Sequence, residues 1–129
     1  MALLLAQLRM EHVGLAALLR QAMRAGPGTD EATAILEEAK QMLLAHLATE
    51  HGKLLAPLRA AAAKDPDLRE LVESKAAERA LRQATLLFTG MDLTCSKAEL
   101  ADAQEGMRAR FLWEETALFP AYERIRRDR

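Results

Sequence analysis

Two stretches of this chain place ionisable side chains at the same helical spacing. Residues 46–58 read HLATEHGKLLAPL and residues 110–122 read RFLWEETALFPAY. In the first stretch His46 is followed four residues later by Glu50, and in the second Arg110 is followed by Glu114. Side chains four apart lie on one face of an α-helix, one turn apart. Imidazole and carboxylate groups brought together from facing helices hold iron, manganese or zinc in helical bundles.

Further ionisable residues lie inside apolar helical stripes elsewhere in the chain. His12 falls between Leu8 and Leu15, and Glu78 falls near the middle of a row that includes Leu81. Mid-helix residues of an antiparallel bundle meet at one level. Burying them without compensation costs several kcal/mol each, so a metal, water or one another must satisfy them. We therefore expect six residues to converge in the core: His12, His46, Glu50, Glu78, Arg110 and Glu114.

Four helical segments separated by three breaks account for the whole sequence. Apolar residues recur at helical spacing over about residues 2–24, from Thr29 or Asp30 to 63, over 66–89 and over 97–124. Short connections make successive helices antiparallel. Half of the residues are apolar but only 4% are aromatic, which favours helix packing over a sheet. The sequence predicts a single domain, residues 1–129, with an all-α, up-down-up-down four-helix bundle.

The breaks carry recognisable helix signals. AGPGTD at 25–30 is a turn, Asp65 before Pro66 is an expected N-cap, and SKAE at 96–99 is an expected capping box. Pro57 lies inside the second helix, where it should kink the helix or weaken the turn before it.

Composition limits the classes of partner and compartment. The chain has 18 basic and 19 acidic residues, so we expect no nucleic-acid binding. It lacks an apolar run of about 20 residues, so we expect no membrane span. One cysteine, Cys95, excludes an internal disulfide and suits a reducing, cytoplasmic setting. Leu3, Leu4 and Leu5 cannot all face one core, which leaves a homodimer open.

The motifs resemble those of the hemerythrin-like, or HHE cation-binding, family. The matching pieces are MEHVGL, where the acidic Glu11 precedes His12, HLATEHGKLLAP with His46 and Glu50, and RFLWEETALFP with Glu114 and Glu115 as carboxylate candidates. The resemblance implies a four-helix bundle around a non-haem di-iron centre. It also implies a metal-ligand set of His12, His46, Glu50 and Glu114, with Glu78 as a substitute ligand.

The chain departs from the family pattern on its third and fourth helices. No histidine follows position 51, and Arg110 stands where the family has a histidine. A guanidinium stays protonated and cannot bind a metal, but pointing inward it would balance some of the acidic charge. Three states remain open: no metal, one metal, or a dinuclear iron centre. Each candidate also has a purely structural interpretation. These are a core role for His12, a surface pair of Glu78 with Arg82, and a position for Glu115 off the Glu114 face.

Two functions follow from these expectations. The first is a degenerate hemerythrin-like module that binds iron or another transition metal and senses or stores iron, oxygen or another diatomic ligand. The second is a metal-free scaffold for protein interaction or dimerisation. We do not expect an enzyme, because the sequence shows no Ser-His-Asp or Cys-His arrangement and no glycine-rich phosphate loop.

Overall fold

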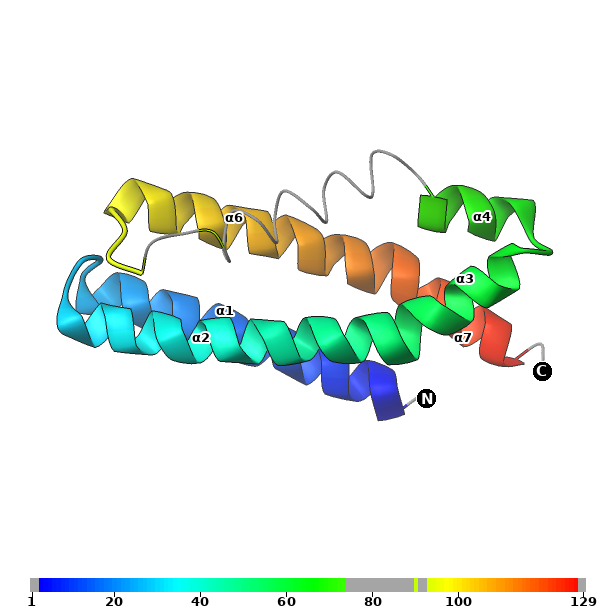
Figure 1. The fold of residues 1–129 in the computed structure, drawn as a ribbon, viewed down its shortest axis with the longest axis horizontal. Coiled ribbons are helices and arrows are strands. Elements are labelled where there is room, and N and C mark those ends of the chain that lie inside the picture. The colour runs from blue at the N-terminus through cyan, green and yellow to red at the C-terminus, as the bar shows by residue number, and fades with distance from the viewer. Residues whose placement is uncertain (1–2, 74–89, 91–92, 128–129) are drawn as a thin grey trace.

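The protein is an all-α four-helix bundle, which confirms the predicted fold class. The computed structural model describes residues 3–73, 90 and 93–127, and no strand occurs among them. The long helices run side by side in Figure 1, with α3 (Ala56–Ala62) and α7 (Phe119–Arg127) at the same end as the start of the first helix. The elements are α1 (Leu3–Ala25), α2 (Asp30–Thr49), the π-helical turn η1 (Glu50–Leu55), α3 (Ala56–Ala62), α4 (Pro66–Glu73), α6 (Lys97–Trp113), the π-helical turn η2 (Glu114–Leu118) and α7 (Phe119–Arg127).

The helix that was predicted over 66–89 is described from Pro66 to Glu73. Residues 74–89 lie outside the described residues, and the predicted site residue Glu78 lies there with them. Within the described ranges, no helix is long and apolar enough to cross a membrane.

The predicted helix starts are confirmed by their capping contacts. The Thr29 side chain accepts a hydrogen bond from the Ala32 amide at 3.1 Å, and Asp65 accepts one from the Leu68 amide at 3.1 Å. Ser96 and Glu99 form the full capping box, at 3.1 and 3.0 Å. These contacts satisfy amide groups that have no partner within the first turn of a helix.

The Ser96 cap gives a stability prediction. Replacing Ser96 with Ala should lower the free energy of unfolding by about 1 kcal/mol, because an amide of the first turn loses its acceptor. Urea unfolding measures the difference, and Lys97→Ala is the control because Lys97 is exposed in the same turn. A change below about 0.3 kcal/mol for Ser96→Ala would show that the cap does not stabilise the fold.

Two apolar clusters lie on either side of a polar layer. One contains Leu15, Leu43 and Met107, and the other contains Leu8, Leu54 and Leu118. Along each helix the polar residues fall between these two clusters. The buried polar and charged side chains of the described residues are His12, His46, Glu50, Arg110 and Glu114. The antiparallel packing therefore brings five of the six expected residues to one level of the bundle.

The two glutamates of the repeated pattern each begin a π-helical turn. The Ala56 amide donates to the His51 carbonyl, and the Phe119 amide donates to the Glu114 carbonyl, each five residues back. A proline follows each of these amides, Pro57 in one copy and Pro120 in the other. A proline ring clashes with the carbonyl four residues before it, and a wider turn moves that carbonyl away. The predicted disturbance at Pro57 thus takes the form of a π turn, a feature frequent at functional sites.

Candidate metal centre

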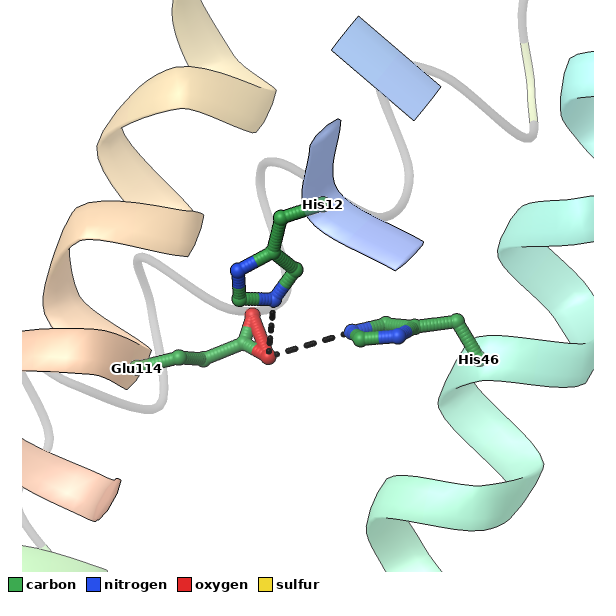
Figure 2. A group of neighbouring side chains, drawn as sticks. All are labelled: His12, His46 and Glu114. Atoms are coloured by element: carbon green, nitrogen blue, oxygen red, sulfur yellow. Dashed lines mark hydrogen bonds and ion pairs between the residues drawn. The ribbon is translucent and has the colours of Figure 1, made fainter. Parts of the chain in front are cut away.

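Three buried side chains from three helical segments meet at one atom. Figure 2 shows His12 of α1 and His46 of α2 pointing toward Glu114, the first residue of η2. The His12 Nε2 lies 3.3 Å from Glu114 Oε1, and the His46 Nε2 lies 3.2 Å from the same oxygen. The ligand atoms of the three residues lie within 4.8 Å of one another, a grouping that could hold a metal ion.

Glu50 brings a second carboxylate oxygen next to this group. Its Oε2 lies 3.4 Å from His46 Nε2 and, alone among the buried side-chain nitrogens and oxygens of the described residues, has no hydrogen-bond partner. A buried carboxylate oxygen without a partner is costly. A bound cation is one way to satisfy it.

Arg110 contacts the same two carboxylates from their other oxygens. Its Nη2 donates to Glu50 Oε1 at 2.9 Å, and its Nε donates to Glu114 Oε2 at 3.2 Å. Each carboxylate therefore gives one oxygen to the guanidinium and turns the other toward the histidines. The predicted inward orientation of Arg110 agrees with this geometry, since its side chain is only 3% exposed.

The three N···O spacings at the centre are similar to the edges of a coordination shell. The three N···O distances of 3.2, 3.3 and 3.4 Å are long for hydrogen bonds. Ligand atoms about 2.1 Å from a shared metal lie roughly 3.0–3.4 Å apart in octahedral or tetrahedral geometry. The His12, His46 and Glu114 ligand atoms therefore form a group that could hold one metal ion, and Glu50 lies beside it through its contact with His46.

The outer nitrogen of each histidine contacts a second carboxylate. The His46 Nδ1 lies 2.7 Å from Glu11 Oε1, and the His12 Nδ1 lies 3.0 Å from Glu115 Oε2. A neutral imidazole has one N–H, so it can donate to only one of its two carboxylate neighbours. With Nδ1 as the donor, each Nε2 presents its lone pair to the centre, as in the carboxylate–histidine–metal arrangement common in proteins.

Glu115 was a second carboxylate candidate on the fourth helix, but the sequence assigned it no specific role. The residue follows Glu114 directly and was expected to lie off its face, but it contacts His12 within the π turn η2. Glu11 had a signal in the sequence, because an acidic residue before the first histidine belongs to the resemblance. Its contact is with His46 of the neighbouring helix and not with His12.

Aromatic rings fix the orientation of His12. Its imidazole stacks on the Phe111 ring, with centroids 4.0 Å apart and planes at 12°. Phe119 lies on a nearly parallel plane 5.8 Å away. Together with the Nδ1 contact, this packing limits rotation of the imidazole. His51, the remaining histidine, is exposed and lies outside the group.

Without a metal ion, the charges around His46 favour its protonated form, which then balances the carboxylates together with Arg110. Burial lowers the pKa of His46, but its contacts with Glu114, Glu50 and Glu11 together raise that pKa to about 10. Burial raises the pKa of Glu50 to about 7, against the opposing contacts with His46 and Arg110. Burial also acts to raise the pKa of Glu114, but its contacts with His12 and His46 hold that pKa well below the usual range. One imidazolium and one guanidinium can then balance two carboxylates.

Comparison with protein-family models, curated proteins and solved structures gave no match for this chain. The hemerythrin-like resemblance therefore stays a prediction from the motifs.

The Glu11 contact can be tested by an isosteric change. Glu11→Gln should weaken metal binding about 10–100-fold, the usual effect of losing a carboxylate behind a metal-binding histidine. The amide keeps the size of the side chain but cannot favour the Nδ1–H tautomer of His46 by charge. Isothermal titration with a divalent metal measures the change, and the exposed Glu38→Gln on α2 is the control. Equal affinities for the two variants would remove Glu11 from the site.

Proposed function

We propose that this chain is a non-enzymatic, hemerythrin-like module that binds one divalent transition metal. The ligand atoms are His12 Nε2, His46 Nε2, Glu50 Oε2 and Glu114 Oε1. The observation that carries the proposal is the buried Glu50 oxygen without a hydrogen-bond partner, 3.4 Å from an imidazole nitrogen that also faces Glu114.

Arg110 accounts for the proposal of one metal and not two. The oxygens of Glu50 and Glu114 that could reach a second metal accept hydrogen bonds from the guanidinium instead, at 2.9 and 3.2 Å. A guanidinium is a permanent cation with donors suited to carboxylates. The guanidinium therefore supplies one positive charge next to the carboxylates, in the position that a second metal ion would otherwise take.

Iron(II) is the proposed metal, with manganese(II) and zinc(II) as the competitors. A set of two imidazoles and two carboxylates suits all three ions, and the resemblance to the hemerythrin-like family favours iron. Four protein ligands leave room for exogenous ligands in an octahedral shell, so the proposal includes sensing of iron or of a diatomic ligand. It places the protein in the cytoplasm, because its single thiol, Cys95, suits a reducing compartment.

Metal titration of the chelator-treated protein tests this proposal. Under anaerobic conditions we expect iron(II) to bind at one ion per chain and to raise the unfolding temperature. At 100 times the dissociation constant the gain is about 2.7 kcal/mol. Absence of saturable binding for iron(II), manganese(II) and zinc(II) would contradict the proposal.

Metal affinity should depend on pH in a defined direction. The proton on His46 must leave before Nε2 can bind metal, and its pKa is about 10. We expect the dissociation constant to fall about tenfold per pH unit between pH 7 and 9, since one proton is displaced. Below the Glu50 pKa of about 7 the slope should steepen, because a second proton is displaced there.

The stability of the metal-free protein should change in the opposite direction. A folded-state pKa raised from 6.5 to about 10 gives stability that is complete below pH 6.5 and is lost as the pH rises toward 10. Urea unfolding at several pH values, with and without metal, measures both effects. A metal affinity independent of pH between 7 and 9 would mean that His46 is not a ligand.

The second candidate function is a metal-free interaction scaffold. It is favoured by the ion pairs of Arg110 with Glu50 and Glu114, which already supply part of the charge that the buried carboxylates need. This candidate predicts no change in unfolding temperature with any of the three metals. It also predicts a stable protein after exhaustive chelation, with self-association or partner binding as its activity.

A further inference from the structure

A pocket of about 500 Å³ lies between α1 and α6, on the outer side of His12. Its volume falls within the range of small-molecule sites in proteins, which are mostly apolar with a few placed polar groups. Its floor consists of Ala16, Leu19, Met107 and Phe111. His12 itself lines the pocket and stacks on Phe111, so the pocket borders the polar layer directly.

The two ends of the pocket differ in charge. At one end His12 and Glu115 are in contact at 3.0 Å. Leu8 of α1 and Leu118 belong to one apolar cluster, and Leu19 of α1 and Leu100 belong to the other, so α1 and the fourth helix run antiparallel.

Because α1 and the fourth helix run antiparallel, the residues at the basic end of the pocket can be placed. Arg20 on α1 and Gln104 and Arg108 on α6 also line the pocket. From residue 12 to residue 20 a helix rises about 12 Å. Arg20 and Arg108 therefore lie toward the end opposite Glu115, where Glu105 pairs with Arg108 and leaves Arg20 to give this end its net positive charge.

The rim of the pocket is apolar and open to solvent. Val13 is 68% exposed and Leu112 is 58% exposed, and both line the pocket.

Arg108 is held by Glu105 through Nη2 at 2.6 Å and Nε at 3.2 Å. That pair fixes the arginine side chain and leaves its Nη1 as a donor.

We propose that this pocket binds a small amphipathic carboxylate, such as a medium-chain fatty acid. The apolar chain lies over Phe111, Met107 and Ala16, and the carboxylate lies at the end with Arg20 and Arg108. The opposite orientation is disfavoured because the carboxylate would lie next to Glu115 and compete with it for its partners Arg9, at 3.8 Å, and His12, at 3.0 Å. An extended chain of eight carbons covers about 9 Å, since each bond of ~1.5 Å advances about 1.3 Å. That length fits the distance between the two ends.

Titration of the intact, chelator-treated protein with octanoate and with 1-octanol, followed by NMR, tests the proposal. The chain has three histidines, so the imidazole signals can be resolved. We expect saturable shifts of the His12 signals and none of His51, with octanoate binding at least fivefold more tightly than octanol. Absence of saturation by about 10 mM octanoate, an affinity weaker than about −3 kcal/mol, would overturn the proposal.

Three variants separate the contributions of charge and shape. Arg20→Gln should weaken octanoate binding at least threefold and leave octanol unchanged. Ala16→Leu should weaken both ligands at least tenfold by filling the floor. Should Ala16→Leu fail to fold, Leu112→Gln at the exposed rim should weaken both ligands about threefold. Unchanged affinities in Arg20→Gln and in the shape variant would overturn the proposal.

The result does not depend on the metal proposal. Octanoate binding to a protein that takes up no metal would support the pocket and contradict the metal centre, and the reverse outcome would do the opposite. Sedimentation at the same concentrations identifies a competing occupant. A dimer that octanoate does not dissociate, together with absent octanoate binding, would show that a second copy covers the pocket and would overturn the proposal.

Discussion

Replacing Glu114 with Gln is expected to abolish metal binding. Glu114 Oε1 is the atom that both histidines face, at 3.3 and 3.2 Å. An amide oxygen carries no charge and is a weak ligand for a divalent transition metal. Because loss of an outer carboxylate already costs about 10–100-fold in affinity, loss of this central ligand should cost more than about 100-fold. Isothermal titration and metal content after gel filtration measure the effect.

The same substitution should destabilise the metal-free protein. Arg110 loses a carboxylate partner, and His46 loses the contact that contributes most to raising its pKa. Removing one partner of a buried ion pair typically costs about 3–5 kcal/mol. Glu105→Gln is the matched control, because Glu105 lies on the same helix and is exposed. Near-normal metal affinity in Glu114→Gln would show that the metal, if bound, lies elsewhere.

Replacing Arg110 with His is expected to increase metal binding. The change removes a permanent positive charge from Glu50 and Glu114 and puts an imidazole in its place. Both effects favour metal binding. The guanidinium no longer repels the metal ion, and the imidazole is a metal ligand. We expect at least a tenfold gain in affinity, or binding of a second ion per chain. Metal content by mass spectrometry, together with titration, distinguishes these two forms of the gain.

Arg110→Met separates the loss of charge from the gain of a ligand. Without metal it should be less stable than the starting protein by about 3–5 kcal/mol, because Glu50 and Glu114 lose their buried cation. Added metal should restore much of that stability, but the gain in affinity should stay below that of Arg110→His. If Arg110→His takes up no more metal than Arg110→Met, the guanidinium does not occupy a position from which an added ligand can reach the metal.

The helix order and most of the polar layer could be predicted from the sequence. His12, His46, Glu50, Arg110 and Glu114 interrupt apolar stripes at mid-helix, and the spacing of four fixes their common face. Short connections with clear caps leave little choice of topology. These are local signals, and local signals translate directly into a level within an antiparallel bundle.

The finer geometry of the site depends on contacts between helices and was not predictable. The division of each carboxylate between Arg110 and a histidine requires the side-chain rotamers of three helices at once. The contact of Glu115 with His12 depends on η2, where five residues separate the donor and the acceptor of the backbone hydrogen bond. A regular α-helical projection places Glu115 about 100° from Glu114, so the sequence pattern pointed away from it.

A crystal structure of the iron-loaded protein with an anomalous difference map tests the central claim most directly. We expect a single peak about 2.0–2.2 Å from His12 Nε2, His46 Nε2, Glu50 Oε2 and Glu114 Oε1, with the Arg110 guanidinium still bonded to both carboxylates. A map without a peak among these four atoms, or with two peaks and Arg110 turned to solvent, would contradict it.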